Sequence, residues 1–147
     1  MYKWNQTASV LVFIVPVPRG RDGNEFQVHN NNSGIIGFFD KNNTVFYGKA
    51  WGKVKGISIR PNRREVQVVV EKDQPGFWMT PFVGKSTVGI DPQAAFELGR
   101  FNQRIGDYAD AIDYFTISAN ARYIPALAHL FNICMGKSQY GAELFIE

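Results

Sequence analysis

The chain has 147 residues, 45% of them apolar and 20% charged, which is enough to bury one or two compact cores and argues against disorder. A single cysteine excludes an intramolecular disulfide and a cysteine-rich metal site. No apolar run approaches the roughly 20 residues of a membrane-spanning helix. The first residues also lack a signal-peptide pattern, so a reducing setting, cytoplasmic or nuclear, is expected.

The net charge of +3 is unevenly distributed. Residues 1–90 hold 12 Lys and Arg against 6 Asp and Glu, a charge of +6, and residues 91–147 hold 4 against 7, a charge of −3. An ordinary solvated surface explains this asymmetry most simply. An acidic partner, or the acidic half of a second copy, is the alternative for the basic half.

The first 90 residues have the pattern of strands separated by turns. Residues 9–15 are almost continuously apolar, which favours a central strand covered on both faces. Residues 65–71 alternate, which places Val66, Val68 and Val70 on one face. The other predicted strands are residues 25–29, 34–39, 44–47 and a segment within 50–59. Six or seven short strands predict an antiparallel β-sandwich over residues 1–86.

The pattern becomes helical from about residue 91. Asp91 followed by Pro92 is a helix-start signal, and Gly106-Asp107 ends that helix and caps a second one. The apolar stripe of the first helix is predicted to be Ala94, Leu98, Phe101 and Ile105. That of the second is Tyr108, Ala111, Ile112, Phe115 and Ala119. A third stretch has Ile124, Leu127, Ala128, Phe131 and Met135 on one face, and residues 139–146 are predicted to form a last, partial helix.

Several segments in the first part resemble the CS domain, the NudC and p-twenty-three type of sandwich. They are Tyr2-Lys3-Trp4-Asn5-Gln6-Thr7, the segment 47–54, the segment 68–72, and Pro75-Gly76-Phe77-Trp78. These segments occur in the same order as in the CS family and extend across residues 2–85. The resemblance implies a binding module for the ninety-kilodalton heat-shock chaperone, for its clients or for dynein-pathway partners.

Residues 95–99 and 106–115 resemble a tetratricopeptide repeat. In such a hairpin Gly99 and Ala111 are small because the helices approach closely, and Phe115 fills the space beside them. Residues 91–147 are therefore predicted to be this hairpin with a degenerate second repeat over 124–146. The usual carboxylate clamp of Lys and Asn is replaced by Phe96 and Arg100, so binding of the chaperone tail by that route is not expected.

The sequence predicts neither an enzyme nor a cofactor or metal site. His29 and His129 have no carboxylate or cysteine at ligand spacing, and no glycine-rich phosphate loop is present.

Residues 60–64 with Lys49, Lys53 and Lys55 form the strongest basic cluster. It is interpreted as a solvated turn or as a contact for an acidic protein. Nucleic-acid binding, which would need exposed aromatic residues between the charges, is not expected. Of the tryptophans, Trp4 and Trp78 are expected to be anchors of the sandwich and Trp51 an exposed hot-spot residue.

The first helix offers a second candidate surface, which either binds an acidic peptide or packs against the sandwich or another chain. The predicted protein-binding residues of the whole chain are Trp51, Lys49, Lys53, Arg63, Arg64, Phe96, Arg100, Gln103 and Arg104.

The sequence thus predicts a non-enzymatic co-chaperone or assembly adaptor. The alternative is a constitutive or stabilising subunit of a large protein or ribonucleoprotein assembly, because a short helical stack usually needs a neighbour. Homo-oligomerisation stays open.

Overall fold

The computed structural model describes residues 1–20, 25–41, 43–62, 64–84 and 89–135. The chain divides into two compact units, Met1–Gly89 and Ile90–Glu147, and the sequence had placed this division between residues 86 and 91. The predicted partial helix over 139–146 lies outside the described residues.

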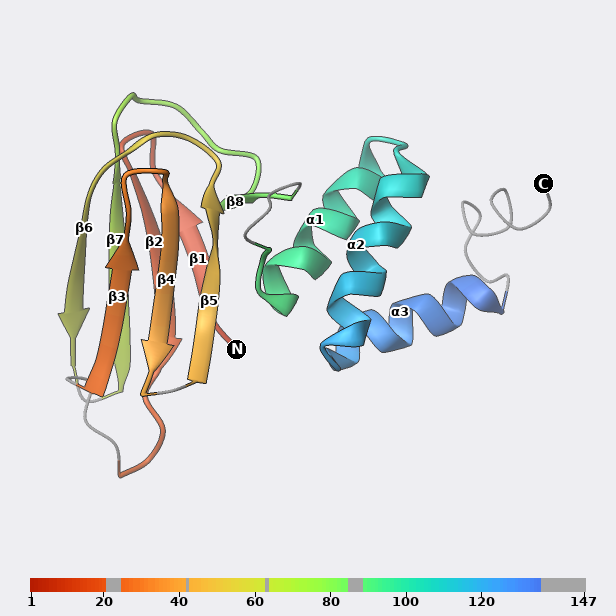
Figure 1. Cartoon of the computed structure of the whole chain (residues 1–147), viewed down its shortest axis with the longest axis horizontal. Helices are drawn as coiled ribbons and strands as arrows, with labels where there is room; N and C mark the ends of the chain where they lie inside the picture. Colours follow the sequence, from red (N-terminus) through yellow and green to blue (C-terminus); the bar gives the residue numbers. More distant parts are fainter. Residues whose placement is uncertain (21–24, 42, 63, 85–88, 136–147) are drawn as a thin grey trace. The chain divides into compact units, whose positions relative to one another are not determined.

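The first unit is an antiparallel β-sandwich, as predicted (Figure 1). One sheet has the order β1-β2-β7-β6 and the other β3-β4-β5-β8. The strands are β1 (Lys3–Gln6), β2 (Val10–Pro16), β3 (Phe26–Asn30), β4 (Ile35–Asp40), β5 (Asn43–Ala50), β6 (Val54–Pro61), β7 (Glu65–Lys72) and β8 (Phe82–Val83). The short edge strands β1 and β8 bring the total in the described part to eight, against the predicted six or seven.

Strand β2 is central in its sheet, between β1 and β7, but only one of its faces is buried. Leu11, Phe13 and Val15 point into the core, whereas Val10, Val12 and Ile14 are half-exposed. The prediction that β2 is covered on both faces was therefore wrong. Antiparallel sheets often leave one face to solvent, and aliphatic residues are tolerated there.

The sandwich core is built around stacked aromatic rings. Phe13 of one sheet and Phe46 of the other have ring centroids 4.0 Å apart, and Phe38 and Phe82 extend the stack on the side of Phe46. Tyr2 closes one end against Phe13 and Phe46. These contacts join the two sheets, since aromatic pairs add to the free energy gained by burial.

A buried lysine ties the beginning of the sandwich to its end. Lys72 is 5% exposed, and its Nζ donates to Gln6 Oε1 (2.7 Å), to the Thr7 carbonyl (2.7 Å) and to the Gly76 carbonyl (2.6 Å). Gln6 also exchanges two hydrogen bonds with the backbone of Trp78. The edge strand β1 and the segment after β7 are thus held by side chains as well as by the sheet.

The second unit has three helices in its described part: α1 (Pro92–Arg104), α2 (Tyr108–Asn120) and α3 (Ile124–Cys134). The predicted start signals are confirmed, because Asp91 accepts from the Ala94 amide (3.1 Å) and Asp107 from the Asp110 amide (3.2 Å). The prediction that Ile105 extends the apolar face of α1 was wrong. It is the residue after the helix and is 60% exposed.

Helices α1 and α2 approach closely where the sequence has a glycine. A methyl group on Gly99 would lie 2.5 Å from the ring of Phe115, which is fully buried. Phe115 forms the core of this unit with Ala111 and with Ile133 of α3. The expected roles of Gly99, Ala111 and Phe115 in close packing are confirmed.

Candidate functional site

A basic hollow surrounds Trp51 beyond the end of strand β5. It has a volume of about 630 Å³ and lies between the turn 30–34 and the segment 49–55. Lys49, Lys53 and Lys55 line it, and none of the described lining residues is Asp or Glu. Three predicted residues, Lys49, Trp51 and Lys53, are therefore brought together.

The backbone on either side of Trp51 is held firmly while its side chain stays exposed. The Trp51 amide donates to the Pro81 carbonyl (3.0 Å), and a methyl group on Gly52 would lie 2.8 Å from the indole of Trp78. Trp78 is buried, Trp4 is half-buried and Trp51 is 38% exposed. Of the three, Trp51 offers the ring most accessible to a partner.

The predicted basic cluster does not form one site. Lys53 precedes β6 and Arg64 follows it, so the two residues lie at opposite ends of this strand. An eight-residue strand spans about 26 Å. Asn62 accepts from the amides of Arg64 and Glu65 (2.8 Å each), so the turn at residues 62–65 has its own side-chain support. Arg63 lies outside the described residues.

On α1, Phe96 is used for packing. Its ring lies 5.6 Å from those of Phe115 and Tyr123 and 6.1 Å from that of His129. Burial, and then the charge of Arg100, lower the pKa of His129. Arg100 and Arg104 are exposed one turn apart and Gln103 is half-buried, so only part of the predicted face is open to a ligand.

Helix α3 turns its predicted apolar stripe to solvent. Ile124, Leu127, Phe131 and Met135 are 70%, 43%, 61% and 59% exposed. The helix packs through its other side, which carries Ala126, Leu130 and Ile133. Because α3 is apolar on both sides, periodicity alone did not tell which side is covered.

The exit from the sandwich exposes two further apolar side chains that the sequence analysis did not single out. Phe77 is 70% exposed and Met79 is 57% exposed, on either side of the buried Trp78. All three residues are apolar, so no sequence pattern separated the exposed Phe77 and Met79 from the buried Trp78.

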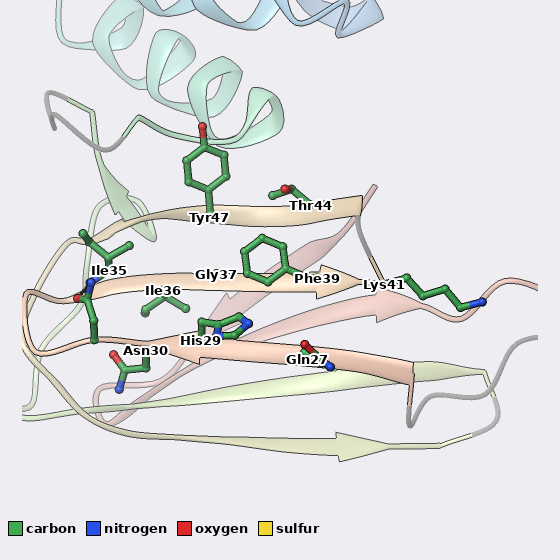
Figure 2. Close-up of a pocket in the computed structure, with 11 residues that line it drawn as sticks. Gln27, His29, Asn30, Ile35, Ile36, Gly37, Phe39, Lys41, Thr44 and Tyr47 are labelled. Atoms are coloured by element: carbon green, nitrogen blue, oxygen red, sulfur yellow. Dashed lines mark hydrogen bonds between the residues drawn. The ribbon is translucent and has the colours of Figure 1, made fainter.

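A second hollow, of about 810 Å³, lies on the outer face of the sheet formed by β3, β4 and β5 (Figure 2). His29, Gly37 and Tyr47 face each other across the three strands. The ring of Phe39 covers Gly37, where a methyl group would lie 2.7 Å from it. Figure 2 shows the ring of Phe39 near that of His29, whereas the side chain of Tyr47 points away from both.

Within the described residues, no group of three or more His, Cys, Asp or Glu is placed to hold a metal ion. In the same part of the chain, none of the helices is both long enough and apolar enough to cross a membrane.

Comparisons with known proteins bear on the first unit. No family model matches the chain, and no curated protein matches it. Among solved structures, the nuclear movement protein from E. cuniculi GB-M1 is similar, with 20% sequence identity and a TM-score of 0.49. The similar region covers 56% of this chain and 98% of that one.

Proposed function

We propose that this chain is a non-enzymatic adaptor of the co-chaperone type, which binds proteins through its sandwich and its helical unit. The expected partners are the ninety-kilodalton heat-shock chaperone, its clients or a dynein-pathway complex, in the cytoplasm. The exposed stripe of α3 is the observation that carries the proposal. The CS-like segments of the sequence support the choice of partner class.

The stripe consists of three large apolar side chains on α3, together with Met135 directly after it, each more than 40% exposed. Fully burying such a side chain is worth about 1.5–3 kcal/mol, so a partner that covers several of them gains substantial binding free energy. Contiguous apolar surface of this kind marks protein contacts, and helices present it at spacings of three and four residues.

Trp51 supplies the corresponding contact on the sandwich. Tryptophan is enriched among residues that dominate binding free energy, and charged neighbours at the rim set orientation and association rate. Lys49, Lys53 and Lys55 surround Trp51, so an acidic protein surface fits this hollow. Arg100 and Arg104 offer the same charge on α1.

The test is quantitative affinity purification of the full chain from its native cell, with partners measured by mass spectrometry. Phe131→Glu is expected to remove partners bound through α3, whereas Asn132→Glu adds the same charge at an exposed polar neighbour and retains them. Trp51→Ala is expected to weaken sandwich-bound partners about 30-fold, the loss typical of a hot-spot residue. Partner recovery unchanged by both Phe131→Glu and Trp51→Ala would contradict the proposal.

The same α3 stripe also favours a second function, a constitutive or stabilising subunit of a large assembly. A helical stack that leaves an apolar face uncovered usually needs a permanent neighbour. Stoichiometry separates the two functions. Substoichiometric recovery of chaperone and varied clients indicates a co-chaperone, and equimolar recovery of one fixed set of subunits without chaperone indicates an assembly subunit.

A further inference from the structure

The outer face of the β3-β4-β5 sheet combines aromatic rings from all three strands. His29 of β3 and Tyr47 of β5 flank Gly37 of β4 in register. The ring of Phe39 lies across that glycine and meets His29 edge-on, with centroids 5.2 Å apart at 67°. The absence of a side chain at Gly37 allows Phe39 to lie low on the sheet, which produces the hollow (Figure 2).

Positive charge surrounds these rings. Lys41 lies at one end of the hollow, and Lys49 follows Tyr47 on the same face of β5, opposite Ile35. Lys41 is paired with Glu25 at 3.9 Å, which offsets its charge, and Asp40 lines a different hollow beside Val15 and Phe26. The unbalanced positive charge is therefore at the Lys49 end.

This face continues into the basic hollow around Trp51, because both hollows share Asn30 and Asn31. Together they carry Lys41, Lys49, Lys53 and Lys55, with neither Asp nor Glu among the described lining residues. The amide side chains of Gln27, Asn30 and Asn31 also line the hollow on the sheet face.

We propose that this surface, the outer face of β3-β4-β5 together with the adjoining lysines, binds single-stranded nucleic acid. Aromatic side chains on a sheet face stack unpaired bases, lysines neutralise phosphates, and amides reach base edges. Aromatic rings also serve protein contacts, so an acidic protein segment is the competing occupant, and the experiment below separates the two. The proposal goes beyond the protein-binding function above and competes with it for Lys49, Lys53 and Lys55, which that function assigned to an acidic protein surface.

The sequence analysis did not expect nucleic acid and interpreted the basic cluster as a solvated turn or as a contact for an acidic protein. His29, Phe39 and Tyr47 lie 10 and 8 positions apart, and only the pairing of the strands brings them together.

The experiment measures binding of the full chain to fluorescent single-stranded RNA and DNA of about 12 nucleotides, within the range that one small β-domain covers. Anisotropy titrations at several salt concentrations give the affinity and its salt dependence. Contacts to three phosphates, made by Lys49, Lys53 and Lys55, predict a slope of about −2.1 for log K against log salt. Lys49→Gln should reduce this slope by about 0.7, whereas Lys3→Gln, the same change on the other sheet, should have a smaller effect.

The rings are tested separately from the charge. His29→Ala and Phe39→Leu should each weaken binding about 5-fold or more, the loss expected for one stacked base. Phe77→Leu, which removes an exposed ring outside this surface, should leave binding unchanged. Tryptophan fluorescence and circular dichroism verify that each variant is folded. His29 is exposed, so its replacement keeps the proposal testable if Phe39→Leu fails to fold.

Absence of binding at low salt would overturn the proposal. Affinity unaffected by both His29→Ala and Phe39→Leu would also overturn it, as would tighter binding of an acidic peptide of equal charge, because the surface would then be an electrostatic protein contact. Preference for RNA over DNA of the same sequence would identify the natural ligand as RNA, and equal affinity would indicate a general single-strand binder. None of these results depends on partner recovery through Phe131 or Trp51, so the two proposals fail separately.

Discussion

Lys72 shows how one side chain links distant parts of the sandwich. Its ammonium group has three hydrogens and three oxygen partners, and the rings of Phe77 and Trp78 lie 5.5 and 5.4 Å from Nζ. Hydrogen bonds to a charged donor are stronger than those between neutral groups, and a matched set offsets the cost of burial. The residues that resemble the CS signature at both ends of the sandwich, such as Gln6 and Trp78, therefore meet at a single ammonium group.

Lys72→Met should lower the free energy of unfolding of the sandwich by about 3 kcal/mol, because it leaves buried oxygens without a donor. Urea unfolding followed by tryptophan fluorescence measures this loss. The control is Lys53→Met, an exposed lysine whose replacement should change stability by less than about 0.5 kcal/mol. Equal stability of the two variants would show that the three hydrogen bonds contribute nothing net.

His129 gives the helical unit a pH dependence. Its pKa is lowered below the ordinary 6.5 by burial against Phe96 and Phe115 and by the charge of Arg100. The unfolded chain then binds the proton more readily than the folded unit does, so this group's contribution to stability is present above pH 6.5 and is lost as the pH falls through the folded pKa. Thermal melts by far-ultraviolet circular dichroism, from about pH 7.5 to about pH 5.5, should show lower stability at the acidic end. His129→Gln should flatten this dependence, and an unaltered pH profile would refute the assignment.

At the scale of elements, glycines lie beneath aromatic rings in both units. Gly48 faces Phe82, Gly52 faces Trp78 and Gly99 faces Phe115, each at a distance where a methyl group would clash. The missing side chain lets an element approach the ring closely, and the ring fills the space. In α1 this packing outweighs the roughly 1 kcal/mol that glycine costs in a helix.

Gly99→Ala should therefore destabilise the helical unit by about 1–3 kcal/mol, although alanine is the better helix former. Urea unfolding followed by circular dichroism measures the change. In the Gly99→Ala background, Phe115→Leu should lower the free energy of unfolding by less than it does alone. Leucine lacks the ring that clashes with the added methyl group. Stabilisation by Gly99→Ala would mean that α1 and α2 separate without penalty.

The sequence predicted the elements whose patterns are internal to them. Strand β7 alternates and α1 begins at Asp91-Pro92, and both are observed. Strands β1 and β8 are only four and two residues long and depend on their neighbours in the sheet, so no local pattern marks them. The outward side of α3 and the grouping of Trp51 with the turn 30–34 likewise depend on tertiary packing.

At the scale of the whole molecule, the two units have separate cores and separate reporters. All three tryptophans, Trp4, Trp51 and Trp78, belong to Met1–Gly89, whereas the described helices α1, α2 and α3 belong to Ile90–Glu147. Fluorescence therefore follows the sandwich and the helical dichroism follows the second unit.

We expect substitutions in one unit to shift only that unit's unfolding transition, because each core is contained within its own unit. Lys72→Met should move the fluorescence transition and Gly99→Ala the helical one. Parallel unfolding curves from the two probes, recorded on each variant, check this. Equal shifts of both transitions in both variants would show that the chain unfolds as one cooperative body.

Because Lys72 is buried, the rate at which its amine is acylated should report opening of the sandwich. An acylating reagent needs a free, solvent-accessible amine, and the Nζ of Lys72 is held by three acceptors in a side chain that is 5% exposed. Surface lysines such as Lys53 should be modified at once, and Lys72 only when the sandwich opens. The difference in labelling rate between Lys53 and Lys72, measured by peptide mass spectrometry, would give the frequency with which the sandwich opens under native conditions.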